Sequence, residues 1–326
     1  MILGRLILTR LADACVLLLL LSVIAFGALK LSSGDLVDAL YGQSLDQLSP
    51  PQTDRLRQQL GLDRPLPVQY LAWLEGVLHG DLGRANGDGR PVLDIIGERL
   101  PYTLLLGSTA LGMALVIGVS MGTAAAAQPG SAIDRCTATF TVAATAVPGF
   151  WLALGLILLF GVWLRWLPTG QPFSTFTPLP SWLDRLQHLL LPALSLAAPQ
   201  SAVIARYVRS SLADVLQADF VRTARSKGLS ARSVVWRHAF RNALMPLITL
   251  IGLDLPRLVG GAVAIEVVFS WPGMGQLFVD AALKRDFALL AGDLLVTSSL
   301  VILANLLADL AYGWVNPRLR SGWSQA

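Results

Sequence analysis

Long apolar stretches recur along the chain, and the segments between them carry most of its charged residues. A helix crosses the hydrocarbon core of a bilayer in about 20 residues. The pattern therefore predicts an all-α integral membrane protein with six transmembrane helices. They are expected at residues 14–29, 100–133, 136–164, 186–205, 242–269 and 287–315.

The first apolar stretch follows Arg5 and Arg10, which is the arrangement of a secretory signal peptide. No clear small-x-small cleavage site comes after it, and several further spans follow. We therefore expect an uncleaved first transmembrane helix. The predicted organisation is an N-terminal helix at 1–30, a long structured loop at 31–99 and a core of five spans at 100–326.

Composition supports membrane insertion, because 54% of the residues are hydrophobic and only 14% are charged. Soluble domains carry about 25% charged residues. The net charge of +4 does not indicate nucleic acid as a partner, because the excess lies in segments that flank spans. Cys15 and Cys136 lie in apolar runs without metal-ligand spacing, so both are predicted to be buried free thiols.

Loop charge predicts the orientation in the membrane. Residues 206–241 hold eight Lys and Arg against two Asp, a balance of +6, whereas residues 31–99 hold six Arg against ten acids, a balance of −4. Cytoplasmic loops carry the excess of Lys and Arg. The basic segment is therefore expected in the cytoplasm, the 31–99 loop outside, and both termini in the cytoplasm.

The outer loop contains one helical pattern. Leu71, Leu74, Val77 and Leu78 recur at helical spacing, with Tyr70 and Trp73 alongside. This predicts a short amphipathic helix on the outer surface. Such a helix would serve as a cap on the bundle, as a docking surface for an external partner, or as both.

The basic segment reads DFVRTARSKGLSARSVVWRHAFRNALMP at residues 219–246. On the N-terminal side of Gly228, Phe220, Val221 and Ala224 fall on one helical face, and Arg222 and Arg225 fall on another. Beyond it, Ser230 is a candidate N-cap for a second helix lined by Val234, Val235 and His238. Glycine adopts the backbone angles that end one helix and start the next. We expect two short helices hinged at Gly228, whereas a plain solvated loop would show no such faces.

Several strings in this chain occur in the order and spacing of a known family. They are RTARSKGLS (222–230), RHAFRNALMP (237–246), ERLPYTL (98–104), PGFWLAL (148–154), WLPTG (166–170) and GGAVAIEVVFSWPGMG (260–275). Together they resemble permeases of binding-protein-dependent ABC importers, in the dipeptide, oligopeptide and nickel branch. The chain departs from the general Glu-Ala-Ala pattern, because Arg222 and Thr223 occupy its first two positions.

The resemblance implies the type I importer permease fold in the bacterial cytoplasmic membrane. It also implies a second homologous permease, two cytoplasmic ATPase subunits and an extracytoplasmic solute-binding protein as partners, besides membrane lipid. This chain is expected to bind no cofactor and to be no enzyme, because it lacks a Walker A sequence. ATP and Mg would be bound by the ATPase partners.

Within that resemblance, residues 217–241 correspond to the cytoplasmic coupling helices that fit grooves on the ATPases. The residues expected to contribute to this coupling are Asp219, Arg222, Thr223, Ala224, Lys227, Gly228, Leu229, Arg237, His238, Asn242 and Pro246.

Charged residues inside spans are candidates for the translocation pathway. Asp254 and Arg257 lie three residues apart and share a helix face. They would either neutralise each other or meet the charged termini of a peptide, since such groups face the bundle interior or water. Glu266 is expected to brace an outer gate, which Trp271, Pro272 and Gly273 would make stiff and tightly turned.

Gly118 and Gly122 form a GxxxG pattern, with Ser108 and Gly112 at similar spacing. Small residues let helices approach closely. The pattern predicts close packing either within this chain or against the second permease.

Peptide import is the predicted function, with import of nickel or a metal–chelator complex as the alternative within the same family. His79, His188 and His238 are far apart in the sequence, so this chain is not expected to build a metal site. A stand-alone secondary transporter usually shows inverted repeats, and we find none. An integral-membrane enzyme would need a clustered catalytic set, and none stands out.

Overall fold

The computed structural model describes residues 2–33, 64–174, 181–230, 233–243, 247 and 262–315. Helices are the main regular structure of the described part, which also contains turns and one isolated bridge between Arg84 and Pro91. Its helices, two of them π-helical and labelled η, are α1 (Ile2–Ser33), α4 (Leu66–Leu78), α5 (Val92–Ala127), α6 (Ala132–Ala146), α7 (Gly149–Leu156), η2 (Ile157–Trp163), α8 (Trp182–Val215), α9 (Asp219–Ser226), η3 (Val234–Ala239), α11 (Phe240–Ala243), α13 (Met274–Leu283) and α14 (Phe287–Val315). The chain forms two compact units, one comprising Met1–Thr103 and Pro272–Leu303, the other Leu104–Trp271 and Ala304–Ala326.

Among the residues that the structure describes, four helices are long and apolar enough to cross a membrane, at Leu8–Lys30, Val92–Ala127, Trp182–Val215 and Phe287–Ala308. A bent pair of helices supplies up to one more. The all-α membrane fold predicted from the sequence is confirmed. Most of the predicted span at 242–269 lies outside the described residues, which include only 242–243, 247 and a helical stretch at 262–268.

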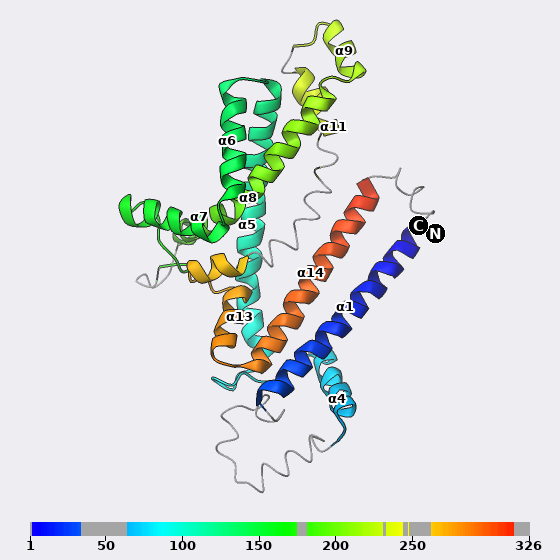
Figure 1. Cartoon of the computed structure of the whole chain (residues 1–326), viewed down its shortest axis with the longest axis vertical. Helices are drawn as coiled ribbons and strands as arrows, with labels where there is room; N and C mark the ends of the chain where they lie inside the picture. Colours follow the sequence, from blue (N-terminus) through cyan, green and yellow to red (C-terminus); the bar gives the residue numbers. More distant parts are fainter. Residues whose placement is uncertain are drawn as a thin grey trace. The chain divides into compact units, whose positions relative to one another are not determined.

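The span predicted at 136–164 is present as a bent pair of helices, and the bend was not predicted from the sequence. The chain bends by 107° between Ala132–Ala146 and Gly149–Trp163, so α7 turns away from α6 (Figure 1). Pro148 explains the break, because a proline forces the residue before it out of the helical conformation. Val147 is indeed extended, with φ −87° and ψ 125°, and Pro148 begins the next helix as its N-cap.

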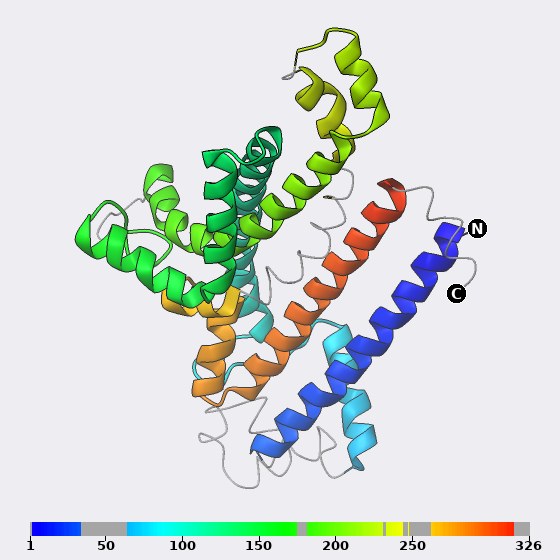
Figure 2. The same cartoon turned by 45° about the horizontal axis from the view of Figure 1, so that its top comes forward.

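In the first unit, α1 and α14 run side by side, with α4 against α1 (Figures 1 and 2). Phe26 of α1 makes an edge-on contact with Tyr70 of α4, with ring centroids 5.6 Å apart. It also lies 5.6 Å from the ring of Trp73. The Ser22 and Tyr70 hydroxyls form a hydrogen bond of 2.7 Å. These contacts fix α4 on the bundle.

The helix predicted in the outer loop is thus present, and only part of its apolar set packs against the protein. Tyr70, Trp73, Leu74 and Val77 pack inward. The side chains of Leu71 and Leu78 are 62% and 78% exposed. Helical spacing groups apolar residues, but it does not distinguish an aromatic packing face from an apolar face left exposed.

In the second unit, α5 approaches α8 closely at Gly118 and Gly122. A Cβ added at Gly122 would lie 2.5 Å from the Ala205 carbonyl oxygen, and one at Gly118 would lie 2.7 Å from the Ser201 carbonyl oxygen. Both distances are far shorter than a normal contact. These two glycines therefore serve packing within the chain, whereas Gly112 has no atom within 4 Å of such a Cβ.

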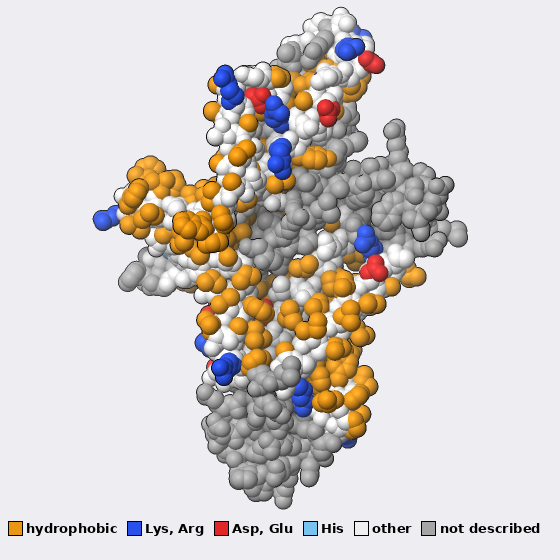
Figure 3. Space-filling model, viewed as in Figure 1, with side chains coloured by type: hydrophobic (Ala, Val, Ile, Leu, Met, Phe, Trp, Pro, Cys, Tyr) orange, Lys and Arg blue, Asp and Glu red, His pale blue; other side chains and the backbone are white. Residues whose placement is uncertain are grey.

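Exposed hydrophobic side chains cover α7 and the long helices, while Lys and Arg gather where α9 and the neighbouring end of α8 lie (Figure 3). This apolar surface suits hydrocarbon rather than water. Cys15 and Cys136 are free but exposed on this type of surface. Their predicted burial is wrong, because an apolar run in a membrane helix does not require contact with other protein segments.

Candidate functional site

The basic segment folds as two short helical pieces joined at Gly228. We call residues 219–243 the basic knob; it comprises α9, η3, α11 and the turn between them. Gly228 has φ +77°, in the left-handed region that glycine adopts without steric cost. Beyond it, the Ser233 N–H donates to the Ser230 hydroxyl at 3.3 Å, as expected of an N-cap. The predicted hinge and cap are both present.

One face of the knob is buried against the ends of two long helices. Val221 and Ala224 of α9 join Val234 and Ala239 of η3 in one apolar cluster. The same cluster contains Leu212 of α8 and Ala126 of α5, together with Ala243 of α11. The Ser211 hydroxyl also donates to the Ala243 carbonyl at 3.0 Å. The knob is therefore fastened to α5 and α8 by apolar packing.

The opposite face of α9 is exposed and charged. Arg222 and Asp219 form an ion pair of 3.8 Å with side chains 76% and 98% exposed, so it adds little to stability. Lys227 and Leu229 are exposed beyond it. Phe220 is 45% exposed, whereas Val221 and Ala224, which the sequence pattern placed on the same helical face, are buried. This face offers cations and apolar side chains to a partner.

The residues expected to contribute to coupling differ in their exposure. Asp219, Arg222, Thr223, Lys227 and Leu229 are exposed, whereas Ala224 is buried in the cluster and Gly228 supplies the hinge. Pro246 and the side chains of Arg237, His238 and Asn242 lie outside the described residues.

The expected outer gate begins with a tight turn after the 262–268 helix. Glu266 is fully buried, and its backbone carbonyl accepts the Trp271 N–H at 2.8 Å. Between them, Ser270 has φ +49°, a strained value for a residue with a side chain. Phe269 and Trp271 are each only 1% exposed. Burial on both sides keeps the turn in this conformation.

A second segment closes on this turn, and the sequence pattern did not indicate it. The Gln171 N–H donates to the Phe269 carbonyl at 2.8 Å. His188 of α8 lies with Nδ1 2.8 Å from the Gly170 carbonyl oxygen and Nε2 3.6 Å from the Asp184 carboxylate. The spacing of four residues was a signal for the contact between Asp184 and His188, because it places both side chains on one face of a helix. The contacts with Gly170 and Phe269 had no such signal.

The remaining pathway candidates are placed only in part. Asp254 and Arg257 lie outside the described residues. Pro272 and Gly273 belong to the first unit, where Gly273 is the N-cap of α13. There the Met274 N–H donates to the Thr103 hydroxyl at 2.8 Å and joins α13 to α5. Within the described residues, no group of three or more His, Cys, Asp or Glu could hold a metal ion.

Comparison with known proteins adds family information to this geometry. Residues 114–321 match the family described as the binding-protein-dependent transport system inner membrane component. Residues 3–107 match the N-terminal part of such membrane components. These two matches include both the basic knob and α4.

Relatives match over almost their full length. A Brucella suis biovar 1 protein named as a peptide permease is 41% identical over 97% of this chain and 99% of its own. The oligopeptide transport system permease protein AppB of Bacillus subtilis is 38% identical over 93% of this chain and 95% of its own.

A solved structure shares the fold. It shows an inward-facing conformation of the MetNI methionine ABC transporter, and the matched chain has a TM-score of 0.54 and 17% identity. The match covers 68% of this chain and 96% of that chain.

Proposed function

Because this chain belongs to the family of binding-protein-dependent transport system inner membrane components, we propose that it is the permease subunit of an ATP-driven peptide importer. The observation that carries the cargo class is the similarity to permeases named for peptides, at 38% and 41% identity over nearly the whole chain. An importer of this type forms its pathway from this chain and a second homologous permease. An extracytoplasmic solute-binding protein delivers the cargo.

The basic knob is the joint with two cytoplasmic ATPase subunits, which bind ATP and Mg. Its exposed face supports this role because it offers charge and an apolar anchor, with Phe220 and Arg222 on α9 and Lys227 directly after it. Its buried face, packed on Leu212 and Ala126, supports transmission of a displacement to α8 and α5. In this arrangement the basic knob and both termini face the cytoplasm.

The turn from Glu266 to Gly273 acts at the outer gate. The complete burial of Glu266 and its backbone bond to Trp271 support a rigid element rather than a mobile loop. Asp254 and Arg257 line the pathway or neutralise each other. Exchanging the two residues separates these roles, since a self-sufficient pair would keep working after the exchange.

The test is uptake in a bacterial host that lacks its own peptide and nickel importers. The host receives this chain with the second permease, the ATPases and the binding protein, and is offered labelled di- to pentapeptides and nickel with and without chelator. Peptide accumulation that stops when the ATPase subunits are omitted is the expected result. Accumulation of nickel without peptide would overturn the peptide assignment, and peptide uptake without the ATPases would overturn the coupling.

A further inference from the structure

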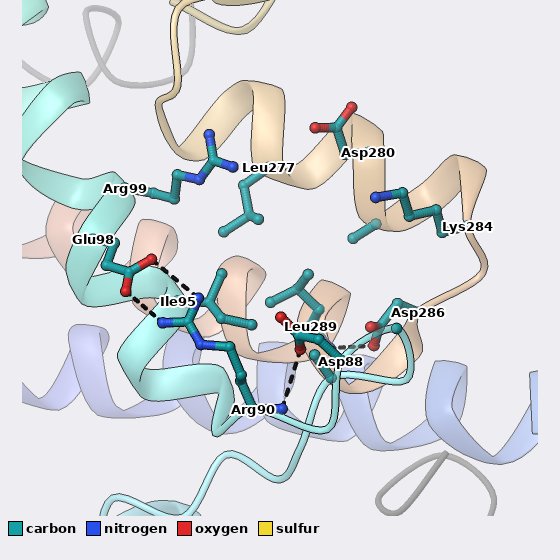
Figure 4. Close-up of a pocket in the computed structure, with 13 residues that line it drawn as sticks. Asp88, Arg90, Ile95, Glu98, Arg99, Leu277, Asp280, Lys284, Asp286 and Leu289 are labelled. Atoms are coloured by element: carbon teal, nitrogen blue, oxygen red, sulfur yellow. Dashed lines mark hydrogen bonds and ion pairs between the residues drawn. The ribbon is translucent and has the colours of Figure 1, made fainter. Parts of the chain in front are cut away.

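A cavity of about 400 Å³ lies in the first unit, among the loop before α5, the first turns of α5, and helices α13 and α14 (Figure 4). Its floor is apolar and buried, formed by Ala85, Ile95, Leu277, Ala281 and Leu289. These residues belong to one hydrophobic cluster, so the floor is a fixed surface.

Hydrogen bonds hold the loop wall of this cavity in place. The Arg90 side chain pairs with Glu98 of α5. The backbone N–H of Arg90 donates to the Asp88 carboxylate at 3.1 Å. The Asp286 carboxylate accepts the Asn86 N–H at 2.7 Å and the Leu289 N–H at 3.1 Å, and so ties the loop to the start of α14. Asp88, Arg90, Glu98 and Asp286 are therefore used within the protein.

Three other charged side chains of the lining are not used in this way. Among the described residues, Arg99, Asp280 and Lys284 form neither an ion pair nor a side-chain hydrogen bond with any partner. Arg99 extends from α5, whereas Asp280 and Lys284 extend from α13, on the other side of the apolar floor (Figure 4). The rim thus offers two cations and one carboxylate above an apolar surface.

We propose that this cavity is a binding subsite for a short zwitterionic peptide, an inference that rests on the proposed function. Arg99 and Lys284 bind the terminal carboxylate, Asp280 binds the terminal ammonium, and an apolar side chain of the peptide covers the floor. Arginine suits this task because its planar guanidinium binds a carboxylate through two parallel hydrogen bonds. A cavity of 300–1,000 Å³ with an apolar lining and a few polar groups is typical of a small-molecule site.

A single peptide in two forms tests the carboxylate contact. The affinity of an apolar tripeptide is measured on the purified complex of both permeases and both ATPases, without the binding protein, with a free or an amidated C-terminus. Arg99→Gln and Lys284→Gln are each expected to weaken binding of the free peptide about tenfold, the loss typical of a charged hydrogen bond. Binding of the amidated peptide should not change, since it lacks the negative charge.

Arg285→Gln is the matched control, because it removes a cation next to Lys284 that does not line the cavity. It should leave both affinities unchanged. Asp280→Asn should weaken binding of the free peptide but not that of its N-acetylated form. Equal losses for the free and amidated peptides in Arg99→Gln, or no loss at all, would overturn the subsite. Peptide uptake by the intact importer is measured separately, so failure of the subsite and failure of the proposed function give different results.

Discussion

Arg209 of α8 holds the Asp134 carboxylate at the start of α6 with two hydrogen bonds, and the bond from Nη2 measures 2.9 Å. The same carboxylate accepts the Gly130 N–H at 3.0 Å, and Ser131 caps α6 by accepting the Asp134 N–H at 3.2 Å. One carboxylate therefore closes the loop between α5 and α6 and fixes it to α8.

Loss of this pair should destabilise the second unit. Arg209→Gln leaves a carboxylate that is only 9% exposed without its cation. We expect a modest loss of stability, because the Arg209 side chain is 45% exposed and water weakens the pairing. The melting temperature in detergent should fall for Arg209→Gln and for Asp134→Asn.

The charge-exchanged double variant, Asp134→Arg with Arg209→Asp, should regain only part of that stability. The exchange restores the ion pair, but it removes the acceptor for Gly130 and puts a cation at a helix N-terminus, where anions are favoured. Full recovery would show that the carboxylate's role at the α6 terminus has been overestimated.

Gly112 and Gly122 of α5 should respond differently to the same substitution. Gly122→Ala places a methyl group 2.5 Å from the Ala205 carbonyl oxygen and should cost about 1–3 kcal/mol through overpacking. Gly112→Ala meets no atom within 4 Å and should be neutral or stabilising, because alanine is the better helix former. Thermal unfolding of both variants in one detergent checks this, and equal melting temperatures would contradict the α5–α8 contact.

The effect of a substitution at Gly228 should depend on whether the new residue tolerates a positive φ, and not on steric contact with neighbouring atoms. An added Cβ there meets no atom within 4 Å, but φ is +77°. Gly228→Val should lower uptake by about tenfold or more, since a non-glycine residue in this region costs about 1–2 kcal/mol and a β-branched one costs more. Gly228→Asn should retain most of the uptake because asparagine tolerates positive φ. Equal uptake by the two variants, with equal amounts in the membrane, would exclude the conformational explanation.

Asp286 should give the first unit a pH-dependent stability. Burial raises the pKa of the Asp286 carboxyl above its ordinary 3.8, although the backbone N–H groups of Leu289, Asn86 and Gly87 favour the charged form. The folded state therefore holds this proton more tightly than the unfolded chain does. The resulting stabilisation is fully present below pH 3.8 and is lost as the pH rises through the raised pKa.

Asp286→Asn removes this titration while keeping an acceptor oxygen. The melting temperature of the wild-type protein minus that of Asp286→Asn should be largest at low pH and should decrease as the pH rises from 3.8 towards neutrality. A difference that grows over this range would mean that the backbone hydrogen bonds outweigh burial.

Local patterns predicted the basic knob well, because its determinants are close together in sequence. A glycine between two helical faces and a serine three residues before Ser233 were enough to place the hinge and the cap. Membrane spans were predictable for the same reason, since length and hydropathy are properties of one segment. The bend at Pro148 was missed, although a proline followed by glycine is a local signal that interrupts a helix.

Contacts between distant segments were not predictable in this way. Arg209 and Asp134 are 75 positions apart, and Asn86 and Asp286 are 200 apart, so no periodicity relates them. The buried face of α4 could not be identified from the sequence, because apolar residues lie on several of its sides and hydropathy alone does not identify the one that packs. Phe220 shows the same limit, since its exposure depends on where α8 meets the knob.

The attachment of the basic knob to the end of α8 has a mechanical consequence. A helix of 34 residues is about 50 Å long, so α8 extends far from Leu212, where the knob is fastened. If α8 pivots as a rigid rod at that end, a rotation of about 5° moves its other end by about 4 Å. A partner that tilts the basic knob slightly would therefore use α8 as a lever. A small rotation at the knob would displace the far end of α8 by about the length of a side chain.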